Sequence, residues 1–175
     1  MSKTISAKTI SQIQYNFTEN DGQRSRQDSD STRFSSEYTY GTGVMQVNSI
    51  IKTTGTIASG GSISIDFSSL AFSSFGLSGT ADINYVKSIL ISNTSTDSGI
   101  DLAIRATGVN SATGFFNGGS GNLLIKPYSS YMYNDPYGGV NVATANNKLQ
   151  LHNVSTTSGS TSGIASYSIT VMGII

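Results

Sequence analysis

Residues 62–67 read Ser-Ile-Ser-Ile-Asp-Phe, with an apolar side chain at every second position. Residues 100–105 read Ile-Asp-Leu-Ala-Ile-Arg and begin with the same alternation. A period of two places the apolar side chains on one face of an extended strand, as in a half-buried β-strand. Glycine, serine and asparagine separate such segments and favour turns between them. These two stretches therefore predict an all-β fold.

The alternation recurs between turn signals from about Val44 onward. Residues 83–91 form one such segment, although its alternation changes phase at Val86. About eight short strands are expected on this basis. They are residues 47–51, 63–67, 83–91, 100–104, 123–125, 140–142, 149–151 and 167–171. Their spacing predicts an antiparallel β-sandwich, jelly-roll-like in type, because no segment has a helical period long enough for a βαβ crossover.

The composition restricts the function more than it identifies it. The chain has 175 residues, no cysteine and a formal net charge of zero. The absence of cysteine excludes thiolate catalysis, cysteine-based zinc sites and disulfides. Balanced charge gives no general attraction to nucleic acid or to an anionic membrane, so we expect neither as a partner. We also expect neither a signal peptide nor a transmembrane segment, because no apolar run suits either role.

The charged residues are concentrated at the start of the chain. Residues 1–40 contain five of the 10 basic residues and five of the 10 acidic ones. Residues 19–36 contain one large apolar side chain, Phe34, and cannot build a core of their own. We therefore expect an extended N-terminal arm over residues 1–40, ordered on assembly, and a sandwich body over residues 41–175. Ile10, Ile13 and Phe17 fit a helical turn and a strand equally well.

The residues that usually carry catalysis are isolated from one another. His152 is the one histidine, and the pattern puts it on the strand face opposite Leu149 and Leu151. Acidic residues occur singly, so a facing carboxylate pair of the glycosidase kind is not indicated. Asp28-Ser-Asp30 resembles the opening of a calcium loop but lacks its glycine and closing glutamate. We expect no catalytic, cofactor or metal site, and hence a protein that is not an enzyme.

Residues 127–137 are unusually rich in tyrosine. Tyrosines with few charges around them can form a sugar-binding platform or a protein interface. Alternation in residues 131–133 fits an ordinary strand as well, and both interpretations stay open. The candidate ligand or interface residues are Tyr128, Tyr131, Tyr133 and Tyr137.

Several segments together resemble structural proteins of tailed bacteriophage virions, of the jelly-roll type that cements or decorates capsids. They are Arg-Phe-Ser-Ser-Glu-Tyr-Thr-Tyr-Gly-Thr-Gly (33–43), Gly-Gly-Ser-Ile-Ser-Ile-Asp-Phe-Ser-Ser-Leu (60–70), Val-Lys-Ser-Ile-Leu-Ile-Ser-Asn (86–93), Leu-Leu-Ile-Lys-Pro-Tyr (123–128) and Tyr-Ser-Ile-Thr-Val-Met-Gly (167–173). This resemblance implies a location in the virion, after synthesis in the host cytoplasm, and partners such as the major capsid protein or another virion protein.

Two functional hypotheses follow. In the first, the protein cements or decorates the outer capsid lattice and contacts neighbouring copies as a homo-oligomer, with a trimer as the working assumption. Its arm would then bind through three arginines and three aromatic anchors: Arg24, Arg26, Arg33, Phe34, Tyr38 and Tyr40. In the second, the sandwich binds carbohydrate or a receptor in a tail or fibre, through the tyrosines of residues 127–137. Neither hypothesis requires a cofactor.

Overall fold

The computed structural model describes residues 4–20, 25–74, 77–108, 110–116, 121–143, 146–154 and 163–175, with backbone alone at 19, 20, 25, 26, 73, 74 and 77. These residues form an all-β fold with fourteen strands, two short 3-10 helices and no α-helix. Within these ranges no helix has the length and apolarity to cross a membrane. The predicted fold class is therefore confirmed at the level of an all-β protein with several antiparallel sheets.

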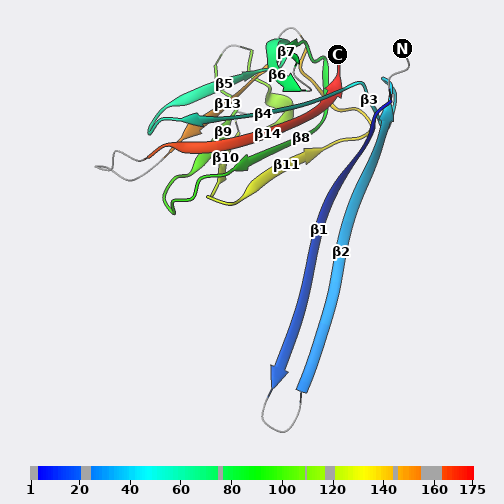
Figure 1. The fold of residues 1–175 in the computed structure, drawn as a ribbon, viewed down its shortest axis with the longest axis vertical. Helices are drawn as coiled ribbons and strands as arrows, with labels where there is room; N and C mark the ends of the chain where they lie inside the picture. The colour runs from blue at the N-terminus through cyan, green and yellow to red at the C-terminus, as the bar shows by residue number, and fades with distance from the viewer. Residues whose placement is uncertain are drawn as a thin grey trace.

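Two sheets form the body of the molecule (Figure 1). One has the order β11 (Ser130–Asn134), β8 (Tyr85–Asn93), β14 (Ala165–Ile174), β4 (Ser49–Ile57), with β12 (Val140–Asn141) also on β8. The other has the order β10 (Asn122–Ile125), β9 (Leu102–Arg105), β13 (Lys148–Asn153), β5 (Ser62–Asp66). All of these pairs are antiparallel. The apolar last segment of the chain, β14, is an interior strand, paired on both sides.

Side chains of both sheets share one core. Leu149 and Leu151 of β13 are buried in this core because they alternate with polar residues. Ile169 and Val171 of β14 enter the same core from the other sheet. Such burial contributes roughly 1.5–3 kcal/mol for each large aliphatic side chain. Two buried asparagines donate side-chain hydrogen bonds to backbone carbonyl oxygens. Asn93 Nδ2 donates to the carbonyls of Ile100 and Ile125, and Asn153 Nδ2 donates to the carbonyl of Ile57.

The phase change at Val86 has a structural cause. β8 and β14 are out of regular register at this point, where Ser88 lies opposite Met172 but Val86 lies opposite Gly173. Lys87 is the extra residue of this β-bulge, so Val86 and Ile89 both face the core. A Cβ on Gly173 would come within 2.6 Å of the backbone oxygen of Tyr85, which leaves room for glycine alone.

The chain between β5 and β8 forms a small separate sheet that was not expected from the sequence. Asp66 ends β5 and caps the 3-10 helix η1 (Phe67–Ser69), accepting a hydrogen bond of 3.0 Å from the Ser68 amide. The chain then forms β6 (Leu70–Ser74) and β7 (Leu77–Ala81), which pair with each other. A second 3-10 helix, η2, covers Thr113–Phe116.

The N-terminal segment is a long hairpin that projects from the body (Figure 1). β1 (Ser6–Asn20) pairs antiparallel with β2 (Ser25–Tyr40) along its whole length, from Ser6↔Thr39 to Asn20↔Ser25. The end of β2 pairs in parallel with β3 (Gln46–Val47). The segment expected as an extended N-terminal arm consists of two paired strands, because pairing across the hairpin supplies the backbone N–H and C=O groups of both strands with hydrogen-bond partners.

The expected number of about eight strands is also too low. Every one of the eight expected segments contains or overlaps a strand. The additional ones are the hairpin strands, β6, β7 and β11, while residues 47–51 are divided between β3 and β4. Of these, β2 is mostly polar and β6 and β7 are short, so their apolar alternation is weak, whereas the alternation in residues 131–133 and the apolar residues of β1 are compatible with a strand.

Candidate interaction surfaces

The root of the hairpin is packed onto the body by Tyr38. This side chain is 1% exposed and forms a small cluster with Val47 of β3 and Met172 of β14. Ile5 and Ala7 cover the cluster from the start of the chain. The hairpin therefore has a fixed base and leaves the body at a defined place.

Asn134, the last residue of β11, joins the root to the body through polar contacts. Its Oδ1 accepts hydrogen bonds from the Tyr38 hydroxyl at 2.5 Å and from Thr9 Oγ1 at 3.3 Å. Its Nδ2 donates to Ser36 Oγ at 3.0 Å. One body residue thus holds both strands of the hairpin. Burial raises the pKa of Tyr38, so its hydroxyl keeps its proton in neutral solution.

An ion pair lies beside this root, on the other face of the hairpin. Lys8 Nζ donates a hydrogen bond to Glu37 Oε1 across the β1–β2 ladder, where the two residues are register partners. The hydrogen bond and the positive charge of Lys8 lower the pKa of the exposed Glu37 carboxyl.

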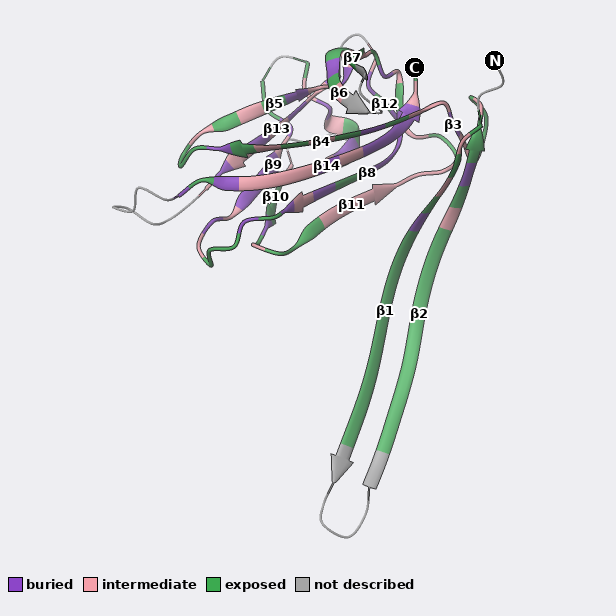
Figure 2. Ribbon diagram, viewed as in Figure 1, coloured by how far each residue is buried: buried purple, intermediate pink, exposed green. Residues whose placement is uncertain are grey.

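Beyond the root the hairpin has two different faces. Because directly paired residues share a face, the register places Ser11, Ile13, Tyr15 and Phe17 on one face with Phe34, Thr32, Asp30 and Asp28. We call this the apolar face of the hairpin. Ile13 is 74% exposed, Phe17 57% and Phe34 74%. The opposite face is polar, with Gln12, Gln14 and Arg33 among its residues. Figure 2 shows the hairpin exposed along most of its length, with burial confined to the root.

The predicted arm residues fall into different environments. Phe34 lies on the exposed apolar face, whereas Arg33 lies on the polar face opposite Gln12. Tyr38 is buried against its own body, and Tyr40 is 42% exposed at the end of β2. Arg26 belongs to β2 with its side chain undescribed, and Arg24 lies outside the described residues. The sequence did not reveal the apolar partners of Phe34 on β1.

The four candidate tyrosines of residues 127–137 also separate. Tyr131 and Tyr133 of β11 pack against the core, where the Tyr133 ring meets Phe115 edge-on with centroids 5.3 Å apart. Burial raises the pKa of both phenols. Tyr128 and Tyr137 are 76% and 72% exposed, in the turns before and after β11. Tyr128 has a positive φ of 59°, a conformation that is costly for a bulky residue.

Lys87 and Asp135 fix the turn that carries Tyr137. The buried Lys87 ammonium donates to the carbonyl oxygens of Tyr137 at 2.5 Å and of Gly138 at 3.2 Å. The Asp135 carboxylate accepts from the amides of Tyr137, Gly138 and Gly139 at 3.1, 3.1 and 3.0 Å. The Lys87 ammonium and the Asp135 carboxylate therefore fix the backbone of residues 137–139, and the Tyr137 side chain is exposed.

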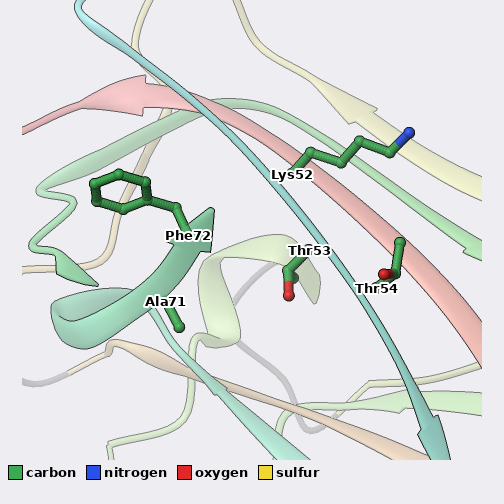
Figure 3. Close-up of a pocket in the computed structure, with 5 residues that line it drawn as sticks. All are labelled: Lys52, Thr53, Thr54, Ala71 and Phe72. Atoms are coloured by element: carbon green, nitrogen blue, oxygen red, sulfur yellow. The ribbon is translucent and has the colours of Figure 1, made fainter. Parts of the chain in front are cut away.

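A groove runs beside β4, and no sequence signal pointed to it. Three hollows of about 610, 490 and 260 Å³ adjoin one another: the middle one shares Phe72 with the largest and Thr53 and Ala71 with the smallest. β4 forms one wall and β6 the other, as the close-up of the middle hollow shows (Figure 3). Lys52 stands at the middle hollow and Asp82 at the largest.

Two further ion pairs lie on the body. Asp66 caps η1 and lies 3.7 Å from Lys148, while Lys126 pairs with Asp101 at 2.6 Å. His152 is half-buried on β13, opposite the buried leucines. Among the residues that the structure describes, no group of three or more His, Asp or Glu side chains is placed to hold a metal ion.

Comparison with known proteins gives no relative to guide the assignment. No protein-family model matches the chain, and a search of curated proteins finds no match.

Proposed function

We propose that this protein is a non-enzymatic assembly subunit whose hairpin binds neighbouring subunits of a larger particle. The observation that carries the proposal is the apolar face of a hairpin that projects from the body with Ile13, Phe17 and Phe34 exposed. An isolated two-stranded ribbon is at best marginally stable in water. Exposed apolar patches that protrude from a body are typical of protein interfaces. A partner that covers this face would stabilise the ribbon and bind through it.

The particle that we propose is a tailed-bacteriophage virion. This part of the proposal is supported by the resemblance of residues 33–43, 60–70, 86–93, 123–128 and 167–173 to virion structural proteins. On this proposal the body is a jelly-roll-like sandwich that cements or decorates the outer capsid lattice. Arg33, on the polar face of the hairpin, supplies a charge for contact with the major capsid protein. The protein is then made in the host cytoplasm and works in the virion.

A shortened hairpin tests the proposal without disturbing the root. Ile10 and Ser35 are register partners, so residues 11–34 can be replaced by the turn Asn-Gly, which joins the strands directly. Tyr38, Thr9 and Asn134 keep their contacts in this variant. We expect it to fold with the same β-rich circular dichroism and to lose binding to virion particles stripped of this protein. Binding at wild-type occupancy would exclude the hairpin as the assembly element.

The backbone conformation of Tyr128 favours a second candidate function, the binding of a carbohydrate or a receptor. An exposed tyrosine held at positive φ is a strained residue, and such strain is concentrated at functional sites. Together with Tyr137 it supplies two exposed rings for a carbohydrate or receptor of a tail or fibre. A glycan array separates this function from assembly. Binding that is lost in Tyr128→Ala and Tyr137→Ala would support it, whereas an array without specific signal would exclude it.

A further inference from the structure

The hairpin and the groove beside β4 are complementary surfaces of the same chain. We infer that the groove receives the hairpin of a second copy, which adds a strand to the exposed edge of β4. The inference rests on the proposed function, because it takes the hairpin to be the assembly element and names its receptor. The contact is one between identical subunits, and it requires no other virion protein.

The free edge of β4 is the first reason. β4 has nine residues, and in the described part of the chain its ladder is formed with β14 alone. The other body strands at sheet edges, β5, β10 and β11, have four or five residues. An unpaired edge presents backbone N–H and C=O groups that an added strand can bond. β6 lies against part of β4 and lines the same hollows, so an incoming strand would have a wall on which to pack.

The dimensions and side chains of the hairpin fit this groove. β1 has 15 residues against nine in β4, which at about 3.3 Å per residue is enough to run along the whole edge. Its apolar face offers a large side chain at every second position, at Ile13, Tyr15 and Phe17. The groove offers successive hollows lined partly by Ile50, Ala71 and Phe72. Strand addition takes its specificity from such pockets for alternate side chains.

The charges are also complementary. Lys52 is exposed at the groove, and Asp28 and Asp30 are exposed on the apolar face of the hairpin. Asp82 is exposed at the largest hollow, and the polar face of the hairpin carries Arg33. Among the described residues, the ion pairs involve neither Lys52, nor Asp82, nor Arg33. Opposite charges in these positions would steer the hairpin into one orientation.

A hairpin does not reach the groove of its own chain. Its root is fixed by Tyr38 beside β3, and the far ends of β1 and β2 lie at the opposite end of the molecule from β6 and β7 (Figure 1). The contact is therefore intermolecular and joins two different surfaces. Repetition of such a heterologous contact gives a closed ring, or an open filament where the rotation does not close.

Cysteine cross-linking tests the pairing directly, since the chain contains no cysteine of its own. One preparation carries Ile13→Cys and a second carries Thr54→Cys, which lies on the groove wall. After mixing and mild oxidation we expect a disulfide-linked heterodimer. Leu124→Cys, also exposed but on β10 of the other sheet, is the control and should give at least about tenfold less cross-link. Equal yields with Thr54→Cys and Leu124→Cys, or linkage of Ile13→Cys mainly to itself, would overturn the inference.

Charge reversal supplies a second measurement on the purified full chain. Sedimentation velocity over a concentration series should show self-association that weakens about tenfold in Lys52→Glu and in the double variant Asp28→Lys, Asp30→Lys. Combining both reversals should restore association, because the opposite charges are restored. A full-length protein that stays monomeric at every concentration, or variants that do not rescue each other, would refute the groove as receptor.

The two proposals fail separately. Loss of particle binding in the shortened hairpin, together with unchanged self-association in Lys52→Glu, would leave the hairpin as the assembly element and eliminate the groove of β4. Particle binding that persists without the hairpin would eliminate the assembly proposal itself.

Discussion

The hydroxyl of Tyr38 donates a hydrogen bond of 2.5 Å to Oδ1 of Asn134, 96 residues further along the chain. Through this contact the second strand of the hairpin is fixed to β11 of the body. The same oxygen accepts from Thr9, so the first strand is fixed as well. A long ribbon with little support of its own is thus held at its root, and its direction in space depends on the contacts made there.

Tyr38→Phe tests the importance of this bond. The ring still fills its site between Val47 and Met172, but the hydroxyl is lost. We expect a decrease of about 1 kcal/mol in the free energy of unfolding, the usual net value of a neutral hydrogen bond. Limited proteolysis of β1 and β2 should become faster, because the root opens more often. Tyr40→Phe is the matched control, since Tyr40 is exposed; equal effects in both variants would contradict the role of the root.

The bulge at Lys87 gives a second prediction. Lys87→Met keeps the length of the side chain but removes two charge-assisted hydrogen bonds to the carbonyls of Tyr137 and Gly138. We expect a loss of about 2–3 kcal/mol in chemical denaturation, because two backbone acceptors lose a buried donor. Lys52→Met, on an exposed position of β4, should change stability by less than about 0.5 kcal/mol. A stable Lys87→Met variant would show that the turn does not depend on the ammonium.

Gly173→Ala probes the other strand of the same bulge. The added methyl would stand 2.6 Å from the backbone oxygen of Tyr85 and 2.9 Å from Ile83 Cγ2. Because the backbone of Tyr85 can move away only at a high energy cost, we expect the free energy of unfolding to decrease by at least about 2 kcal/mol, measured as a lower melting temperature. Gly60→Ala, at a turn with no atom near the new methyl but a positive φ, should cost less, about 1 kcal/mol. The reverse order of the two effects would contradict this packing.

Alkaline pH should destabilise the protein. Burial raises the pKa of Tyr38, Tyr131, Tyr133 and Tyr167, so the folded state retains phenolic protons that the unfolded state gives up. The contribution of these tyrosines to the free energy of unfolding should therefore be constant below about pH 10, and the free energy of unfolding should fall as the pH rises above it. Denaturation at several pH values, with absorbance at the tyrosinate band, measures both effects. Tyr131→Phe with Tyr133→Phe should reduce the decline; a decline of the same size would assign it to other groups.

The sequence predicted the body well because its strands have one buried face each. Ile63 and Ile65, or Leu149 and Leu151, alternate with polar residues, and that alternation is visible without knowledge of the fold. The hairpin was harder to predict, since residues 25–33 contain no large apolar side chain and β2 is held by backbone pairing. The Asp21-Gly22 dipeptide, which favours tight hairpin turns, was the available signal.

The candidate sites depend on relations that a single sequence does not contain. Phe34 was predicted to be an anchor of the arm, but its place on one face with Ile13 and Phe17 follows from the register of β1 and β2. Tyr38 was expected to be an anchor of the arm, and its contacts turn out to be with its own body. The groove of β4 is formed by segments about twenty residues apart, β4 and β6, whose relative placement is set by the whole core.

The apolar face of the hairpin can be tested most directly by binding to virion particles stripped of this protein. The variant Ile13→Ser, Phe17→Ser, Phe34→Ser removes the three exposed apolar side chains, and Gln12→Ser, Gln14→Ser, Arg33→Ser changes the opposite face to the same degree. Saturation binding by cosedimentation should be lost in the first variant and retained in the second, reduced by no more than about tenfold through the missing charge. Undiminished binding of the first variant, with its fold intact, would contradict the account.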